Sequence, residues 1–246
     1  MSGFPSPTVE QLISLARYGG KNRFIAAREV SKLDPSKVDL ESLLWLIEIL
    51  VSDPESPEFS ELGMSLGSLI ERMDEQVVYN LFEKLMEDKK KKLLLIIVLS
   101  STKARLDTDV VLEVVRRLIS DESEEIRNGA LSILKNFLGK VRKDEISEII
   151  YELANSEQDE LRQFAITALL VFKDVFDASV ITDILLVLLD TEKPEIWHHV
   201  ISGLESSLLS KILKSKKAFR ELLNKIESTD GTEFKEKFKR LLTRRE

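Results

Sequence analysis

Apolar residues recur at helical spacing in two adjacent stretches between residues 111 and 137. In the first, from Leu112 to Ile119, they follow at intervals of three, three and one residues, which is one face of an α-helix. In the second, from Ile126 to Phe137, they follow at intervals of four, three, one and three. Between them the acidic residues 121–125 supply a cap and favourable negative charge near the start of the second helix. The pattern predicts a helical hairpin.

This hairpin pattern recurs along the chain. Ile126-Arg127 returns after 35 residues as Leu161-Arg162, and after 35 more as Ile196-Trp197. Backward steps of 33, 35 and 36 residues reach Leu93-Leu94, Glu58-Phe59 and Asn22-Arg23. The last copy, near the C-terminus, is degenerate. Such a period is typical of stacked helical repeats, so we expect an all-α fold, a right-handed α-α superhelix of about seven hairpins.

A single repeat domain over residues 1–246 is the predicted organisation, because no segment resembles an interdomain linker. A solenoid of this length can bury one continuous core. The predicted repeats cover approximately residues 6–34, 38–73, 74–105, 107–140, 143–174, 178–210 and 213–246.

The repeat unit resembles the HEAT repeat. The resemblance rests on the pattern Asp121…Ile126-Arg127-x-x-Ala130 and spans essentially the whole chain. It implies an armadillo-like solenoid whose second helices line a concave surface. Several copies depart from it: Phe59, Leu94 and Trp197 stand in place of the arginine, and Ser156 and Thr191 in place of the aspartate. Any ladder of Asp–Arg contacts is therefore interrupted. A tetratricopeptide array has a similar period, but its Trp, Leu-Gly and Tyr pattern is absent.

The composition narrows the class of protein. The chain has 43% hydrophobic residues, 32% charged residues and no cysteine, which excludes disulfides and thiolate metal sites. Together these features favour an intracellular protein of thermophilic origin. The longest apolar run, Leu93 to Leu99, is too short to span a bilayer, and no N-terminal stretch has the pattern of a signal peptide. We expect a soluble, cytoplasmic protein with no membrane partner.

The net charge of −7 is distributed unevenly. Residues 211–246 hold 12 Lys and Arg against 6 Asp and Glu, a net charge of +6, which leaves −13 for residues 1–210. The basic end, which includes Lys235, Lys239 and Arg240, has two interpretations. It is either an electrostatic site for phosphate backbones or the polar capping repeat that a solenoid needs.

The second helix of the third repeat is leucine-rich on every side. Aligned with the fourth repeat at a step of 33, Leu95 and Leu99 take the places of Asn128 and Ser132. The HEAT resemblance then implies an apolar concave face around Met64, Leu95 and Leu99, which would suit an amphipathic helix of a partner protein. The alternative is that this helix is buried on all sides.

The turns inside the repeats are acidic and are expected to lie along one rim, interrupted by Lys89 to Lys92 in the third turn. Two interpretations are open. The acids form a docking edge for a basic partner, or they are helix-terminal acids in water that the helix dipole stabilises.

Three features that could carry chemistry are weak. Gly63-Met64-Ser65-Leu66-Gly67 matches a hydrolase nucleophile elbow, but no strand precedes it, so we interpret its glycines as sites of close helix contact. His198 and His199 are adjacent and point about 100° apart on a helix, which disfavours a shared metal. Trp197 could anchor a partner or a base, or fill the junction with the last repeat.

No reactive constellation stands out, so we predict a non-catalytic scaffold without cofactor or metal that binds a protein partner on the concave face or the acidic rim. The candidate contact residues are Met64, Leu95, Leu99, Trp197, His198, Lys235, Lys239 and Arg240. The alternative is a nucleic-acid-binding protein. Some DNA glycosylases that remove alkylated purines have similar helical repeats, but the concave Trp and Asp and abundant basic residues expected of them are not found. A HEAT-type lyase acting on a tetrapyrrole has only the repeat in its favour.

Overall fold

The computed structural model describes residues 6–102, 106–191 and 193–243. These residues form helices joined by turns and short connections, and they contain no β-strand. The predicted all-α, solenoid-like class is therefore confirmed. No helix in the described ranges combines the length and apolar character needed to cross a membrane.

The chain divides into two compact units, Met1–Phe137 and Leu138–Glu246. The prediction of one domain over the whole chain stays a prediction. Each helix pair in the described residues lies within one of the intervals that the repeat pattern delimits.

The described residues of unit 1 form four helix pairs. They are α1 (Val9–Arg17) with α2 (Lys21–Glu29), α3 (Leu40–Leu50) with α4 (Pro57–Ile70), α5 (Glu75–Leu85) with α6 (Lys89–Ser101), and α7 (Thr108–Ile119) with α8 (Glu124–Asn136). Two short 3-10 turns, η1 (Val30–Lys32) and η2 (Pro35–Lys37), connect the first pair to the second.

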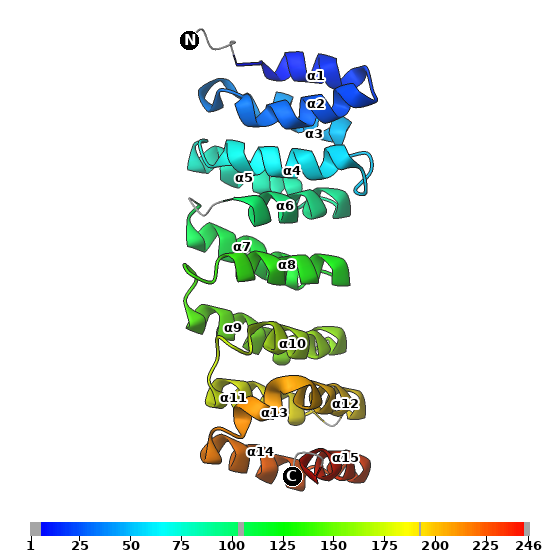
Figure 1. The fold of residues 1–246 in the computed structure, drawn as a ribbon, viewed down its shortest axis with the longest axis vertical. Coiled ribbons are helices and arrows are strands. Elements are labelled where there is room, and N and C mark those ends of the chain that lie inside the picture. Colours follow the sequence, from blue (N-terminus) through cyan, green and yellow to red (C-terminus); the bar gives the residue numbers. More distant parts are fainter. Residues whose placement is uncertain (1–5, 103–105, 192, 244–246) are drawn as a thin grey trace. The chain divides into compact units, whose positions relative to one another are not determined.

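The helices of unit 1 are arranged in two layers. Helix α2 packs on α4, α4 on α6 and α6 on α8, and we call these four helices the second-helix layer. Helix α1 packs on α3 and α3 on α5, and an Arg117–Glu83 ion pair joins α7 to α5. In Figure 1, α4, α6 and α8 lie on the near side of unit 1.

Short polar residues start most of these helices. The side chains of Asp39, Ser56, Asp74 and Asp88 each accept a hydrogen bond from a backbone N–H in the first turn. Such caps satisfy donors that have no partner within the helix. At α1 the Thr8 side chain and that of Gln11 form a reciprocal capping box. The hairpin boundaries are thus determined by local sequence.

Two glycines bring α4 close to α6. A Cβ atom on Gly63 would lie 2.4 Å from Ile97 Cγ2, and one on Gly67 would lie 2.2 Å from Ser101 Oγ and 3.0 Å from the Val98 carbonyl oxygen. Neither position has room for a side chain, because atoms this close repel. The glycines therefore serve close helix packing, as predicted.

Unit 2 contains three helix pairs. They are α9 (Lys143–Ala154) with α10 (Asp159–Phe172), α11 (Ala178–Leu189) with α12 (Pro194–Gly203), and α14 (Lys216–Ser228) with α15 (Thr232–Thr243). Helix α12 continues through a π-helical turn, η3 (Leu204–Leu208), into α13 (Leu209–Ile212). Here α9 packs on α11 and α11 on α14, while α10 packs on α12 and α12 on α15.

The register predicted for α6 is wrong by two residues. The caps of the first helices, Asp74 and Asp107, are 33 residues apart, as predicted. The caps of the second helices, Asp88 and Ser123, are 35 apart. The difference arises because α5 and its turn are together two residues shorter than α7 and its turn. An alignment that applies the same 33-residue step to both helices of the repeat therefore misplaces every residue of α6.

Candidate interaction surface

Leu95 and Leu99 do not lie on an open face. Both are fully buried in α6, so their predicted role as partner contacts is wrong. In the observed register they take the places of Ala130 and Leu134, which are also buried. The alternative interpretation, burial of these leucines in the core, describes their environment.

An apolar surface nevertheless exists on the second-helix layer of unit 1. Met64 of α4 is 48% exposed and Ile25 of α2 is 37% exposed. Leu93, Ile96 and Ile97 of α6 are half-buried. We call these five residues the apolar strip. Leu93 and Ile97 hold the positions that Asn128 and Ser132 hold in α8, so α6 has an outward apolar face formed by other leucine and isoleucine side chains than those predicted.

The strip is held in place by small residues on the neighbouring helices. Ile97 lies over Gly63 of α4, and Ile96 lies over Gly129 of α8, at distances that exclude a Cβ atom on either glycine. The two isoleucines are therefore partly inserted between helices, with their remaining surface outward. Their position is set by packing, which limits the entropy they would lose on binding.

The equivalent positions of unit 2 are polar. At the 35-residue period, Asn128 and Ser132 correspond to Gln163 and Thr167 in α10 and to His198 and Ser202 in α12. These four side chains are exposed or half-buried. Among the described second helices, a continuous set of outward apolar residues is thus a property of unit 1.

Three acids of the turns in unit 1, Glu58, Asp121 and Glu125, are paired with cations from neighbouring repeats. The lysines of the third turn provide most of these contacts: Lys91 Nζ lies 2.5 Å from Glu48, Lys92 Nζ 2.6 Å from Asp121 and Lys89 Nζ 3.3 Å from Glu125. Lys90 Nζ donates to the Ser52 carbonyl oxygen at 2.9 Å, and Arg23 pairs with Glu58 at 3.4 Å. The four lysines therefore link the third repeat to both of its neighbours.

Two of these groups have shifted pKa values. The hydrogen bond to Glu48 raises the pKa of Lys91 above its ordinary value. Burial acts to raise the pKa of Asp121, but hydrogen bonds from Lys92 and from the Ser123 N–H outweigh it, and the pKa is lowered. Both shifts stabilise the charged forms, as expected for partners held at contact distance. Part of the rim thus consists of structural ion pairs.

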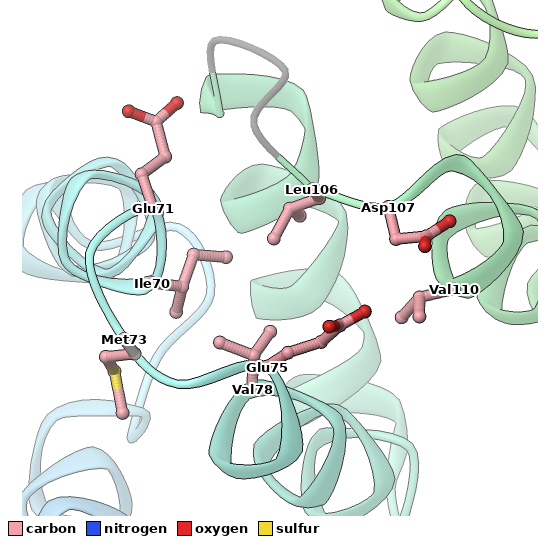
Figure 2. Close-up of a pocket in the computed structure, with 8 residues that line it drawn as sticks. All are labelled: Ile70, Glu71, Met73, Glu75, Val78, Leu106, Asp107 and Val110. Carbon is pink, nitrogen blue, oxygen red and sulfur yellow. The ribbon is translucent and has the colours of Figure 1, made fainter.

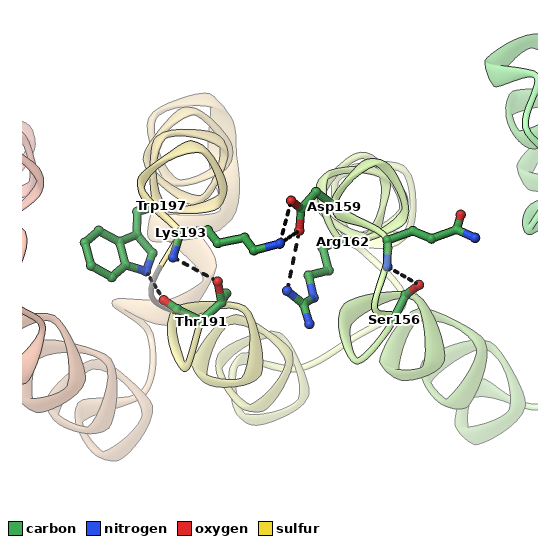
Figure 3. Close-up of polar contacts among 7 residues, drawn as sticks. Ser156, Asp159, Arg162, Thr191, Lys193 and Trp197 are labelled. Carbon is green, nitrogen blue, oxygen red and sulfur yellow. Dashed lines mark hydrogen bonds and ion pairs between the residues drawn. The ribbon is translucent and has the colours of Figure 1, made fainter.

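Unit 2 shows how the turns tolerate departures from the repeat pattern (Figure 3). In the fourth repeat Asp121 accepts from the N–H two residues later, at 2.8 Å. Ser156 and Thr191 take its position and accept the same bond through their hydroxyl oxygens, at 3.1 and 3.0 Å. A link between repeats is made instead by Lys193, whose Nζ lies 2.7 Å from both carboxylate oxygens of Asp159.

Trp197 replaces an arginine and makes an equivalent hydrogen bond. Arg127 donates to the carbonyl oxygen of Asp121, six residues earlier, at 2.8 Å. Trp197 Nε1 donates to the carbonyl oxygen of Thr191, also six residues earlier, at 2.8 Å. The indole is 9% exposed and its ring centroid lies 5.7 Å from that of Phe234 in α15. Trp197 therefore fills the junction with the last repeat and is not available as an open anchor.

The two histidines are exposed and lie apart from any cluster of ligands. Nδ1 of His198 lies 2.7 Å from the Pro194 carbonyl oxygen, and Nδ1 of His199 lies 2.9 Å from that of Glu195. His198 Nε2 is 3.8 Å from Glu233. Within the described ranges, no group of three His, Asp or Glu side chains has the arrangement of a metal site.

Ser65 lacks the environment of a nucleophile. It lies in the middle of α4, it is 5% exposed, and its Oγ donates to the Arg28 carbonyl oxygen at 3.2 Å. A nucleophile elbow needs a strand-to-helix turn that exposes the serine. The helical setting excludes that function.

Several basic residues near the C-terminus are engaged in ion pairs. Lys211 pairs with Asp174 at 3.0 Å, and Lys225 pairs with Asp190. Within α15 Lys237 pairs with Glu233 at 2.8 Å and Arg240 with Glu236 at 3.6 Å; Lys239 is exposed and Lys235 half-buried. Arg244 and Arg245 lie outside the described residues. The intramolecular pairs reduce the charge available to a phosphate backbone.

Sequence reasoning missed an exposed aromatic pair on the first helices. Trp45 of α3 lies in an apolar run that predicts a core position, but this prediction is wrong, since Trp45 is 51% exposed, with the Arg17 guanidinium 4.5 Å from its ring centroid. Tyr18 is 81% exposed. The signal that could have found Trp45 is its helical phase, since it lies off the buried face formed by Leu43, Leu46, Ile47 and Leu50.

A cavity of about 340 Å³ lies in unit 1 between the C-terminal end of α4 and the first turns of α5 and α7 (Figure 2). Its apolar lining comes from Ile70, Met73, Val78, Leu106 and Val110. Glu71, Glu75 and Asp107 border it, and the Glu71 carboxylate points away from the others. Among its described lining residues there is no nucleophilic side chain paired with a general base.

Comparisons with known proteins add little to this geometry. No protein-family model matches the chain, and no curated protein matches it significantly. Among solved structures, the crystal structure of an engineered protein is similar: it is 18% identical, with 90% of this chain and 97% of that chain covered and a TM-score of 0.36. A likeness at this level carries no conclusion about function.

Proposed function

We propose that the chain is a non-catalytic protein-interaction scaffold, built of repeats that resemble HEAT repeats, and that it binds its partner through the apolar strip. The supporting observation is the strip itself. Side chains of this kind on a monomer surface mark sites of association when they are contiguous and rimmed by polar residues. Extended surfaces of stacked helices are used for binding in this way.

Two other surfaces support the proposal less well. Two rim acids of unit 1, Asp121 and Glu125, are paired with lysines of the adjacent repeat, so a basic partner would have to displace contacts that already exist there. The basic residues near the C-terminus are partly paired, which weakens the alternative of nucleic-acid binding.

The test is affinity capture from a lysate of the source organism with three forms of the protein. Wild type and Met64→Leu keep an apolar side chain in the strip, whereas Met64→Glu introduces a charge at a position that is 48% exposed. We expect one protein to be enriched by wild type and Met64→Leu and lost with Met64→Glu. Enrichment of no protein, or equal enrichment by all three forms, would overturn the proposal.

A further inference from the structure

The two long edges of the apolar strip differ in charge. Three exposed cationic residues lie near the C-terminal ends of second helices. They are Arg28 in α2, Arg72 just after α4 and Lys135 in α8. Arg28 is on the same outward face of its helix as Ile25, and Arg72 lies two turns beyond Met64 on α4. The strip therefore has a basic edge.

Neighbouring acids leave this edge with available positive charge. The carboxylate nearest Arg28 is that of Glu29, at 3.8 Å, and Glu29 is bound more closely by Lys32, at 2.8 Å. In the described part of the chain no carboxylate lies within ion-pair distance of Lys135. Arg72 donates to the carbonyl oxygens of Ser31 and Ser68 at 2.5 and 3.3 Å, which offsets the partial negative charge of the helix ends.

The opposite edge, where the second helices begin, is mixed in sign. Its acids include Glu58, Glu61, Glu124 and Glu125, of which Glu58 is paired with Arg23 and Glu125 with Lys89. A ligand with one charged side would therefore be oriented by the strip, with its negative side against the basic edge. Charge arranged in this way sets the register and choice of partner more than it sets affinity.

The dimensions of the strip indicate the form of such a ligand. The strip runs from α2 to α6, and its basic edge continues to Lys135 on α8, so the whole surface spans three helix spacings, or about 27 Å at the usual interaxial distance of roughly 9 Å. An α-helix covers that length with about 18 residues at 1.5 Å per residue. Its apolar residues would recur every three to four positions to face Ile25, Met64 and Ile97.

We propose that the occupant of the apolar strip is an amphipathic helix of a partner protein whose polar face is acidic on one side, paired with Arg28, Arg72 and Lys135. This inference rests on the proposed function and names the chemical class of its partner. The apolar side chains of the helix supply contact area. Its carboxylates select this edge of the strip.

The test is fluorescence anisotropy of two labelled 20-residue helical peptides titrated with the full chain at low salt. They share the same leucine positions, and one carries glutamates where the other carries lysines. Wild type is expected to bind the acidic peptide at least about tenfold more tightly than the basic one. In the double variant Arg28→Glu/Lys135→Glu the preference should reverse. Arg72 is left unchanged because it also bonds to the Ser31 carbonyl oxygen.

The matched control is Lys140→Glu/Lys217→Glu, which changes the net charge equally at exposed positions outside the second-helix layer of unit 1. It should retain the preference for the acidic peptide, and all forms should melt alike. Equal affinity for both peptides would overturn the acidic-helix inference and leave the proposed function standing. Binding of neither peptide would also overturn it, while the capture experiment with Met64→Glu would decide the proposed function separately.

Discussion

At the scale of single residues, this chain keeps the roles of its repeat positions while changing the residues that fill them. A turn acceptor is an aspartate at 121, a serine at 156 and a threonine at 191, with the same backbone N–H bonded in each case. A carbonyl six residues upstream is reached by Arg127 or by Trp197. By sequence these residues depart from the repeat pattern. Their hydrogen bonds show that they replace the aspartate and the arginine in the same structural roles.

Asp121 gives a prediction on pH. Its pKa is lowered from the ordinary value of 3.8, so ionised Asp121 stabilises the fold above that pH, and this contribution is lost as the pH falls through the lower folded-state value. Asp121→Asn keeps an acceptor for the Ser123 N–H but loses the charge opposite Lys92. We expect it to lower the free energy of unfolding by about 1–2 kcal/mol at neutral pH, measured by urea denaturation.

The difference between Asp121→Asn and wild type should shrink as the pH is lowered below about 4, because wild type then loses the same charge. Asp159→Asn is the control. Its pair with Lys193 is more exposed, so the effect should stay below about 1 kcal/mol. An equal loss in both variants, or a difference for Asp121→Asn that does not depend on pH, would contradict the assigned role.

Trp197 gives a second prediction at this scale. Trp197→Phe keeps an aromatic ring against Phe234 but removes the indole N–H that binds the Thr191 carbonyl oxygen. We expect a loss of about 1 kcal/mol in the free energy of unfolding. Trp45→Phe, at a site that is 51% exposed, should change it by less than about 0.5 kcal/mol. If Trp45→Phe were the more damaging change, the assignment of Trp197 to the repeat junction would be wrong.

At the scale of helices, periodicity predicted the helix pairs because the spacing of apolar residues and the turns between them depend on local sequence. It predicted the α6 surface incorrectly because a helix and turn that are two residues shorter displace the second helix without changing the first. An all-apolar helix offers no polar residues that would reveal its phase, so Leu95 and Leu93 look alike in sequence. Only the packing of Ile97 on Gly63 and of Ile96 on Gly129 settles which side faces outward.

Leu95→Ser tests this assignment on α6. Leu95 is fully buried, so the change leaves a cavity and a hydroxyl in the core, and we expect a loss of about 3–5 kcal/mol in the free energy of unfolding. Met64 is exposed, so Met64→Ser should lower the free energy of unfolding by less than about 1 kcal/mol. Thermal melting of both variants distinguishes the two sites. A small loss for Leu95→Ser would indicate that Leu95 lies at the surface, and it would contradict a 35-residue step between α6 and α8.

At the scale of the whole molecule, composition and repeat period predicted an all-α array, but the site depends on which side chains each helix turns outward. The polar second helices of unit 2 and the apolar strip of unit 1 have the same period and the same hairpin form. Two outward positions illustrate the difference, where α6 of unit 1 has Leu93 and Ile97 and α10 of unit 2 has Gln163 and Thr167. Under the proposed function, binding is thus carried by a few positions on a uniform scaffold.

Binding through the apolar strip is tested most directly by site-specific photo-crosslinking in a lysate of the source organism. A benzophenone side chain would be placed at position 64 or 97 in the apolar strip, and at position 140 or 151 as exposed controls, after α8 and in α9. We predict that positions 64 and 97 form adducts with one and the same protein and that position 151 does not. Adducts formed only from the control positions, or none from the strip, would contradict binding through this surface.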